Sequence, residues 1–542
     1  MNENDTQIIT RKLVIKPTFS SKNVWHKKVM EFTINDLNTK IENYKEWICN
    51  TKKNKKFDED EKMRRLEKYT SLLANCEQSL KSVNETGVFT QSMVNNYTYS
   101  LIKDAMESEA RMKNYILSWM FATMIENGVQ YMDFKEQKKF INEMIKPAYR
   151  VKGSKKGGLF DDVEIKNILS RYGISFSQEL TRKVSDSVKN GLLNGKVSLP
   201  TFKLNSPFSV AKEHMGFSHD YDSIEELFEH IHEKDCKLYF DFGGRCSPTI
   251  ARFTIDLGKN RNKDELLCTL MRVYSGEYKY CGSSIQFDKS GKKIVLNLSM
   301  EIPVQESDLN EDIVVGVDLG QAIPAVCALN TNSYVRESIG SINDFLKIRT
   351  QIQNQRRNLS KQLKFTKGGH GRKKKLQALN RYESRESNFV ETYNHMVSNR
   401  VVAFALKHHA KYINLESLKG FDASDKVLRN WSYYQLQQYI TYKANKYGII
   451  VRKINPCFTS QVCSCCGTWA EGQRKSQSEF VCSNPNCETH KNNRKSINAD
   501  YNAARNIAKS TLWFDGEVKE KHKEEAAKYY NIPYKKKDKD DE

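Results

Sequence analysis

The spacing of apolar positions changes along the chain, and the changes predict helical, β-rich and mixed regions in turn. Residues 9–16 alternate imperfectly and stop at Pro17, which is typical of a single strand. Residues 35–195 are charged, and their apolar positions recur every three or four residues, which predicts helices. Within the helix expected from Asn95 to Asn127, the apolar stripe at 112–123 is expected to face the core. Contact between two copies of the chain is the alternative.

Strand-like segments separated by turn residues replace this pattern between 196 and 311. Pairs such as Gly243-Gly244 and Ser290-Gly291 mark the turns. The segments predicted to be strands are 237–242, 249–256, 266–274 and 294–302. We expect an antiparallel barrel or sandwich that the N-terminal strand joins.

From residue 312 onward, short apolar runs alternate with amphipathic stretches, which predicts a mixed α/β domain. The runs predicted to be strands are 312–320, 325–329, 411–419 and 448–455. The stretches predicted to be helical are 345–381, 384–410 and 430–447, and the glycines at 368–371 are expected to break the first of them.

Three carboxylates occupy matching positions in this region. Asp318 and Glu416 each stand at the end of a predicted strand, and Asp500 falls in the first turns of a helix. Taken alone, Asp318 is equally well explained as the cap of a turn. Together, however, the three acids can converge on a pair of divalent cations, and two-metal phosphodiester chemistry requires hard oxygen ligands around metals about 3.5–4 Å apart.

Cysteines cluster between the second and third of these acids. The chain has 13 cysteines, an odd number without the regular spacing of a disulfide framework. Cys463 and Cys466 form a Cys-x2-Cys pair, and Cys482 and Cys487 form a Cys-x4-Cys pair. Four thiolates at this spacing predict one closed, structural zinc site. Cys465 and His490 make the choice of ligands slightly ambiguous.

The charge of the chain predicts a polyanionic partner. The formal net charge is +21, and residues 345–381 hold twelve Lys or Arg residues without one acidic residue. A solvated helix normally alternates its charges, so nucleic acid is expected along this span. The expected contact residues are Arg356, Arg357, Lys361, Lys364, Arg372, Lys373, Lys374 and Lys375.

A membrane is the competing polyanion, and the sequence argues against it. The most apolar uncharged run, 115–125, is far shorter than the ~20 residues that span a bilayer. The first residues, Met-Asn-Glu-Asn-Asp, lack the apolar core of a signal peptide. We therefore expect a cytoplasmic protein, and we expect the cysteine cluster to bind metal in a reducing compartment.

The motifs around the carboxylates resemble a known family. The sequences Gly-Val-Asp318-Leu-Gly, Asn-Leu-Glu416-Ser-Leu, the four-cysteine insertion and Asn-Ala-Asp500-Tyr-Asn-Ala-Ala-Arg-Asn-Ile follow in that order. This order resembles the RuvC-type nuclease core of the RNase H superfamily, and more narrowly the prokaryotic type V-F CRISPR effectors and their transposon-encoded TnpB relatives. The resemblance covers roughly the last two hundred residues. The first three hundred are similar in layout and length alone.

The resemblance implies a multidomain α+β protein. It would contain an RNase H-like (RuvC) α/β nuclease domain with a zinc-finger insertion, a β-barrel (wedge) domain and a helical recognition lobe. The implied boundaries are 1–34 for the N-terminal wedge strand, 35–195 for the helical lobe, 196–311 for the wedge barrel, 312–455 for the first nuclease part with its basic helices at 345–381, 456–495 for the zinc-binding, target-loading insertion, 496–515 for the second nuclease part and 516–542 for a charged tail.

The resemblance also implies an activity, which is RNA-guided, Mg²⁺-dependent cutting of DNA. Asp318, Glu416 and Asp500 would hold two Mg²⁺, and Arg474 matches an arginine that the family directs at the cleft, with Lys475 and Arg494 as competitors. The implied partners are a guide RNA, target double-stranded DNA and single-stranded DNA, with two copies of the protein on one guide. The apolar helix at 112–125 and the aromatic region near Trp25 are the surfaces expected to pair.

Three other functions are weighed against this one. A transposon-encoded TnpB-like nuclease would share the motifs, but the helical region and the length exceed what that group usually needs. A guide-directed binding protein with an idle nuclease site is disfavoured because all three acids are present. A DDE transposase fits poorly with a zinc insertion between the second and third acids.

Overall fold

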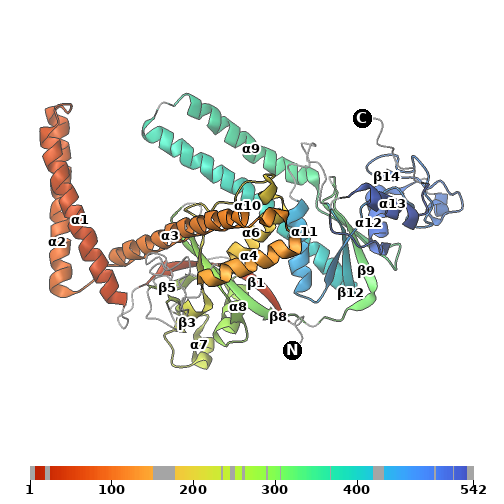
Figure 1. Ribbon diagram of the computed structural model, residues 1–542, viewed down its shortest axis with the longest axis horizontal. Coiled ribbons are helices and arrows are strands. Elements are labelled where there is room, and N and C mark those ends of the chain that lie inside the picture. The colour runs from red at the N-terminus through yellow and green to blue at the C-terminus, as the bar shows by residue number, and fades with distance from the viewer. Residues whose placement is uncertain are drawn as a thin grey trace. The chain divides into compact units, whose positions relative to one another are not determined.

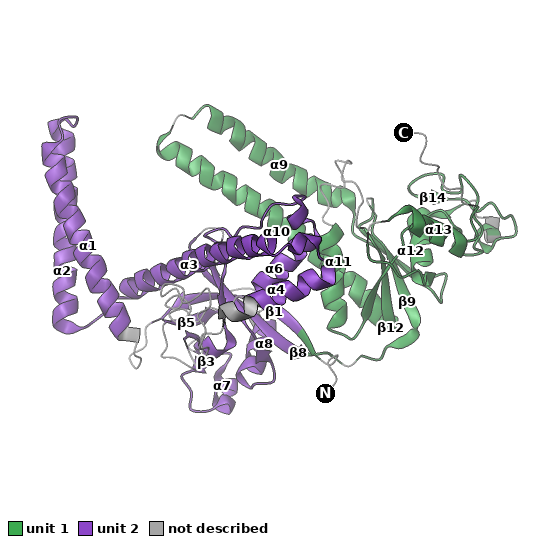
Figure 2. Cartoon of the chain, in the orientation of Figure 1, with its two compact units in different colours: residues 1–7, 303–542 green, residues 8–302 purple. Residues whose placement is uncertain are grey.

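The computed structural model shows two compact units (Figure 2). Residues 8–302, purple and labelled unit 2 in the figure, are called the first unit because they come first along the chain, and residues 1–7 with 303–542, green and labelled unit 1, are called the second unit. We describe each unit by itself. The residues whose structure is described are 6–18, 25–149, 177–233, 236–243, 251–258, 263–288, 291–305, 307–320, 322–366, 368–418, 433–493, 496–516 and 518–533. The part of the helical prediction at 150–176 and the side chain of Trp25 lie outside this set.

The helices of the first unit confirm most of the helical pattern (Figure 1). They are α1 Trp25–Lys53, α2 Glu59–Thr86, α3 Gln91–Glu126, α4 Phe134–Tyr149 and α6 Ser177–Lys189. Local sequence sets their limits, since Asp58 caps the start of α2 by accepting a hydrogen bond from the Glu61 amide, and Gly87 ends α2 in the left-handed conformation.

The apolar stripe of α3 lies in the core of this unit. Met112 is 4% exposed, Ile116 is 1% exposed and Met120 is fully buried. They pack in one cluster with residues of α6 and of the sheet of the same unit. The expectation that this stripe faces the core is therefore confirmed. The alternative, that the helix at 112–125 pairs two copies of the chain through this stripe, is corrected because these side chains are buried within one chain.

The β-rich region forms one eight-stranded sheet. Its strands are β1 Thr6–Pro17, β2 Phe208–Val210, β3 Met215–His219, β4 Leu238–Phe242, β5 Ala251–Asp256, β6 Lys279–Tyr280, β7 Ser283–Phe287 and β8 Ile294–Pro303. The order is β2-β7-β8-β1-β5-β4-β3, with β6 also paired to β8. The N-terminal strand joins this sheet, as expected, and lies in its middle. Among the pairings of the described residues, none joins β2 to β3 into a closed barrel.

The segment 266–274 was expected to be a strand and is a helix, α8 Lys263–Tyr274. Its buried residues Leu267 and Leu270 are three apart, which is a helical and not a strand spacing. Asp264 and Glu265 stand in its first turn and Arg272 in its last, where they complement the helix dipole. A second helix, α7 Ile224–His230, also interrupts the strands of this region.

The second unit contains a five-stranded mixed sheet in the order β11-β10-β9-β12-β13. Its strands are β9 Asn310–Asp318, β10 Ala325–Leu329, β11 Arg336–Ile339, β12 Ala410–Glu416 and β13 Ile450–Ile454. β9 pairs antiparallel with β10 and parallel with β12, and β12 pairs parallel with β13. Because β9 and β12 are parallel, their carboxyl ends meet at one edge of the sheet.

Helices cover both faces of this sheet (Figure 1). The helices of this unit are α9 Ile342–Lys364, α10 Gly369–Lys407, α11 Tyr433–Asn445, α12 Ala499–Lys509 and α13 Glu520–Tyr529, and α10, α11 and α12 pack on the sheet. Val315 and Val317 of β9 pack with α10 and α11, whereas Ala504 of α12 packs with β10 on the other face. The glycine break separates α9 from α10 as predicted, but α10 continues without interruption through the helix expected at 384–410.

The C-terminal segment expected to be a charged tail contains α13, which packs into the unit. Ala527 of α13 and Ile532 are buried in a cluster with Val462. Among the described residues, no helix is both long and apolar enough to cross a bilayer.

Candidate active site

The sheet places two carboxylates side by side. Leu415 of β12 pairs with Val317 of β9, so Glu416 and Asp318 follow at the same edge. Side chains alternate along a strand, and both acids therefore point to the face that α12 covers rather than to the α10 and α11 core. A buried apolar strand ending in an acid is the local pattern that predicted this placement.

Helix α12 brings the third carboxylate. Asn498 caps the helix by accepting a 2.8 Å hydrogen bond from the Tyr501 amide, which puts Asp500 in the first turn. At the other end, the Nδ2 atom of Asn414, two residues before Glu416, donates to the Ile507 carbonyl at 2.9 Å. Asn414 is 1% exposed, so this bond fixes the helix to β12 inside the unit.

Two further asparagines of the α12 motif hold the segment that precedes the cysteines. The Nδ2 atom of Asn502 donates to the Val462 carbonyl at 2.8 Å, and the Asn506 Nδ2 donates to the Thr459 carbonyl at 2.7 Å. The Ser464 amide donates back to Asn502 at 2.8 Å. The motif around Asp500 thus serves as a structural joint as well as a source of one carboxylate.

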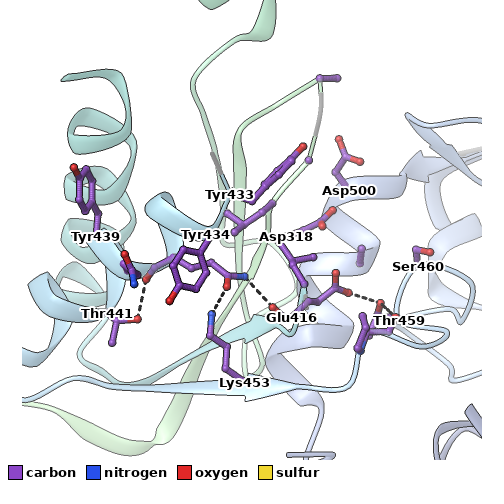
Figure 3. Close-up of a pocket in the computed structure, with 18 of the residues that line it drawn as sticks. Asp318, Glu416, Tyr433, Tyr434, Tyr439, Thr441, Lys453, Thr459, Ser460 and Asp500 are labelled. Carbon is purple, nitrogen blue, oxygen red and sulfur yellow. Dashed lines mark hydrogen bonds between the residues drawn. The ribbon is translucent and has the colours of Figure 1, made fainter. Parts of the chain in front are cut away.

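The three acids line one cavity of about 1050 Å³ (Figure 3). Arg474, Thr459 and residues of α11 complete its wall. Thr459 was not singled out in the sequence, and its Oγ1 lies 2.5 Å from Oε1 of Glu416. Only the fold brings these two residues together, since no local motif joins them.

The arginine expected at the cleft is present. The Nη2 atom of Arg474 lies 4.0 Å from Oδ1 of Asp500, and it also donates to the Gln477 carbonyl at 3.4 Å. Its competitor Lys475 is exposed and is not among the residues that line the cavity, and Arg494 lies outside the described residues.

Burial and mutual repulsion raise the proton affinity of the site. Burial raises the pKa of Asp318 well above its usual range, and the charges of Glu416 and Asp500 raise it further against the opposing effect of Arg474. Burial raises the pKa of Glu416 to about 7, although the hydrogen bond with Thr459 and the charge of Arg474 lower it. Burial also raises the pKa of Asp500, which Arg474 opposes.

Among the described residues, two cationic side chains, Arg474 and Lys453, line the cavity with the three carboxylates, and Arg474 is the one whose charge lowers the pKa of all three. Ionising all three therefore leaves excess negative charge in a partly dehydrated cavity. Hard oxygen donors with excess negative charge are the environment that Mg²⁺ or Ca²⁺ prefers. The donor set fits a divalent metal site.

The four predicted cysteines converge beside this cavity. The Sγ atoms of Cys463, Cys466, Cys482 and Cys487 all lie within 4.8 Å of one another. The Cys463–Cys487 and Cys466–Cys482 sulfur separations are 3.7 and 3.5 Å. Four sulfurs at about 2.3 Å from a tetrahedral zinc would be about 3.8 Å apart, so the group fits zinc.

The two ambiguous candidates have other partners. The sulfur of Cys465 lies 3.8 Å from Oε2 of Glu488, and Nε2 of His490 lies 2.9 Å from the Cys482 carbonyl. Neither belongs to the four-sulfur group. The geometry favours the ligand set that the spacing predicted.

Comparison with known proteins places these features in a family. A family described as Cas12f1-like, TNB domain matches residues 433–507. The chain is 32% identical over 327 residues to a CRISPR-associated endodeoxyribonuclease Cas12f1 from Sulfoacidibacillus thermotolerans, covering 58% of this chain and 71% of that protein. The chain belongs to the Cas12f1 family.

Other comparisons agree with this assignment. The Cas12f1 of Syntrophomonas palmitatica is 31% identical over 378 residues, covering 63% of this chain and 72% of that protein. A cryo-EM structure of a Cas12f1–sgRNA–target DNA complex is similar in fold, with a TM-score of 0.59 and 20% identity, covering 94% of this chain and 100% of that one. The stretch matched by the Cas12f1-like TNB domain runs from α11 through the cysteine group to α12.

The basic residues expected to bind nucleic acid lie on the hairpin of α9 and α10, which extends from the five-stranded sheet (Figure 1). Three of them have partners within the hairpin. Arg356 is 3.6 Å from Glu386, an acid just beyond the acid-free span, and Arg372 donates to the carbonyls of Leu363 and Thr366 where α9 ends. The Nζ atom of Lys375 donates to the Thr366 hydroxyl at 3.1 Å. The other five are exposed, and they are Arg357, Lys361, Lys364, Lys373 and Lys374.

Proposed function

We propose that this Cas12f1 family member is an RNA-guided DNA endonuclease that cuts DNA in the cavity between β9, β12 and α12. The observation that carries the proposal is the convergence of Asp318, Glu416 and Asp500 on one cavity. The relatives that share the family are named CRISPR-associated endodeoxyribonucleases, which supports the same activity.

The three carboxylates would hold two Mg²⁺, which when bound supply an activated water and stabilise the charge that develops on the phosphate. Arg474 would bind a phosphate oxygen of the DNA strand beside Asp500. The walls of the cavity restrict water, which strengthens these charge interactions. In this proposal the second unit contains a RuvC-type, RNase H-like nuclease core, and its strand order supports that assignment.

The cysteine group would hold one structural zinc. A four-thiolate site has no open position, so the metal stabilises the insertion instead of taking part in the chemistry. Asn502 and Asn506 tie α12 to the segment leading into this group, so its loss would disturb the helix that carries Asp500.

The partners follow from charge and fold. A guide RNA would supply sequence specificity by base pairing, and the exposed basic residues of the α9–α10 hairpin would contact the guide or the target duplex. The eight-stranded sheet and the helices of the first unit are proposed to be the wedge and the recognition lobe. Target double-stranded DNA would be opened, and its strands would enter the cavity singly.

Two copies of the protein are proposed to assemble on one guide RNA. A chain of 542 residues is short for enclosing a guide–target duplex of about 20 base pairs. Mass measurement of the assembled ribonucleoprotein tests this part, and one protein per guide RNA would contradict it.

Sequencing the RNA that co-purifies with the chain separates the candidate functions. A repeat-derived guide supports the CRISPR effector, whereas a transposon-end RNA supports a TnpB-like nuclease. The purified complex should then cleave a matched duplex with Mg²⁺. Guided binding without cleavage would indicate a binding protein with an idle site, and strand transfer would indicate a transposase.

A further inference from the structure

The side of α11 that borders the cavity is lined by aromatic and amide side chains. Those that line the cavity are Tyr433, Tyr434, Gln437, Gln438, Tyr439, Thr441, Tyr442 and Asn445. Except for Tyr439, they recur at the spacing of one helix face. An adjoining face is apolar and fully buried in the core, through Leu436, Ile440 and Ala444. One face of α11 is therefore used for packing, and the other faces the cavity.

Two tyrosines of this face have large exposed fractions although they line the cavity. Tyr434 is 67% exposed and Tyr442 is 40% exposed. Tyr439 stacks on His395 at 4.2 Å and meets Tyr442 edge-on at 5.8 Å, so the second ring is braced from one side. Large exposed rings are suited to stacking against a flat partner, and Tyr442 is in addition supported by a neighbouring ring.

The face is also hydrogen-bonded to the backbone of Glu416, one of the three carboxylate residues. The Gln437 Nε2 donates to the Glu416 carbonyl at 2.9 Å, and Lys453 donates to the Gln437 Oε1 at 2.6 Å (Figure 3). α11 carries no acidic residue, so this wall does not repel a phosphate backbone. Tyr434 and Tyr442 are eight residues apart, or about 12 Å along the helix, which is the length of three or four stacked nucleotides of one strand at about 3.4 Å each.

We propose that this side of α11, the tyrosine face, stacks unpaired bases of the DNA strand that is cut, with Tyr434 and Tyr442 as the stacking residues. The inference rests on the nuclease function proposed above and names the side chains that would hold the bases of its substrate. Bases inside a duplex are covered by their neighbours, so a ring on a cavity wall can stack only on bases of a single strand. Stacking is tolerant of sequence, as a guide-directed nuclease requires.

The test compares Tyr434→Ala, Tyr442→Ala and the double variant with Tyr334→Ala in the guide-loaded protein. Tyr334 is 82% exposed and does not line the cavity, so it controls for loss of an exposed ring. Stacking on an aromatic side chain is typically worth a factor of about 5 to 150 per base, so each cavity variant should raise KM for a single-stranded oligonucleotide at least about five-fold. Binding of the guided duplex should not change.

A second measurement does not depend on cleavage. In an Asp318→Ala background, an oligonucleotide carrying 2-aminopurine should lose fluorescence on binding, and Tyr434→Ala should restore part of it. A scan of abasic positions should find one at which Tyr434→Ala no longer weakens binding, because the stacking partner is already missing. Equal weakening at every abasic position would overturn the stacking role.

The outcomes separate this inference from the function on which it rests. A guide-loaded wild-type protein that does not cut DNA would contradict the nuclease function itself. Cutting by the wild type, with a double variant that behaves like Tyr334→Ala, would overturn the tyrosine face alone. If an alanine variant unfolds at a lower temperature than the wild type, the variants Tyr434→Phe and Tyr442→Phe replace it in the test. They keep the aromatic ring, so stacking predicts that they keep the wild-type KM.

Discussion

Gly316 of β9 lies directly beneath Ala508 of α12. A Cβ atom at Gly316 would come within 2.0 Å of the Ala504 carbonyl oxygen and 2.2 Å of the Ala508 amide nitrogen. These neighbours are backbone atoms, so they cannot turn aside as a flexible side chain could. The absence of a side chain two residues before Asp318 is what allows the helix that carries Asp500 to rest on the strand.

We therefore expect Gly316→Ala to displace α12 and to separate two of the carboxylates. Overpacking of this kind costs roughly 1–3 kcal/mol and sometimes more, and cleavage should fall further than stability. Gly371→Ala is the matched control, because a Cβ there has no neighbour within 4 Å. The control should keep wild-type DNA cleavage and should not lose thermal stability, because alanine is a better helix former than glycine. Wild-type cleavage by Gly316→Ala would contradict the close approach.

Removing one carboxylate should separate cutting from binding. Asp318→Ala or Asp500→Ala is expected to reduce cleavage by at least about a thousand-fold, since metal chemistry supplies several kcal/mol of the barrier reduction. Guided DNA binding, measured by electrophoretic mobility shift, should survive. Loss of binding in step with cleavage would show that these residues are structural.

Cleavage at limiting Mg²⁺ should decrease as the pH falls below about 7. Burial raises the pKa of Glu416 to about 7, so below this pH its protonated form competes with metal binding. Raising the Mg²⁺ concentration should move the midpoint of the pH profile to lower pH. A midpoint that stays fixed across Mg²⁺ concentrations would place the titrating group elsewhere.

The same raised pKa predicts how the Mg²⁺-free protein responds to pH. A carboxyl whose pKa rises on folding, here from 4.5 to about 7, stabilises the fold below pH 4.5 and loses that contribution as the pH rises through 7. Glu416→Gln should therefore raise the unfolding midpoint at pH 8 in buffer without Mg²⁺ by roughly a few degrees, and much less at pH 4.5. Calorimetry at the two pH values checks this. A gain of equal size at both would exclude ionisation as the cause.

The cysteine group predicts about one equivalent of zinc per chain. Cys463→Ser together with Cys466→Ser should release the metal and lower cleavage through loss of the insertion. Cys465→Ser provides the control, because its sulfur lies outside the four-sulfur group. Mass spectrometry of the metal content measures the zinc bound per chain. Stoichiometric zinc in the double variant would show that other residues bind the metal.

The parts of the site that sequence predicts are those with local signals. A β-branched run ending in an acid indicates Asp318, and cysteine spacing indicates the metal ligands. Thr459 and the tyrosines of α11 carry no such signal, because their role depends on how distant segments meet at Glu416. The segment at 266–274 was misread for the opposite reason. A dense apolar run obscures its period, and the acids of the first turn were the better guide.

The cations of the α9–α10 hairpin fall into two groups, those that are exposed and those that form hydrogen bonds within the hairpin, and the two groups should respond differently to substitution. Arg357, Lys361 and Lys364 are exposed along α9, whereas Arg372 donates to carbonyls where α9 ends. Changing the three exposed residues to Gln should weaken binding of guide RNA and reduce the salt dependence of that binding, since each phosphate contact releases counterions. Thermal stability should hardly change.

Arg372→Gln should lower thermal stability and leave the binding of guide RNA nearly unchanged, because the contacts of Arg372 are inside the hairpin. Loss of its hydrogen bonds at the end of α9 should lower thermal stability by about 1 kcal/mol, with a salt slope close to that of the wild type. Filter binding from low to high salt, beside thermal unfolding, distinguishes the groups. An unchanged salt slope in the triple variant would show that the guide and target are bound elsewhere, and that the acid-free span serves another purpose.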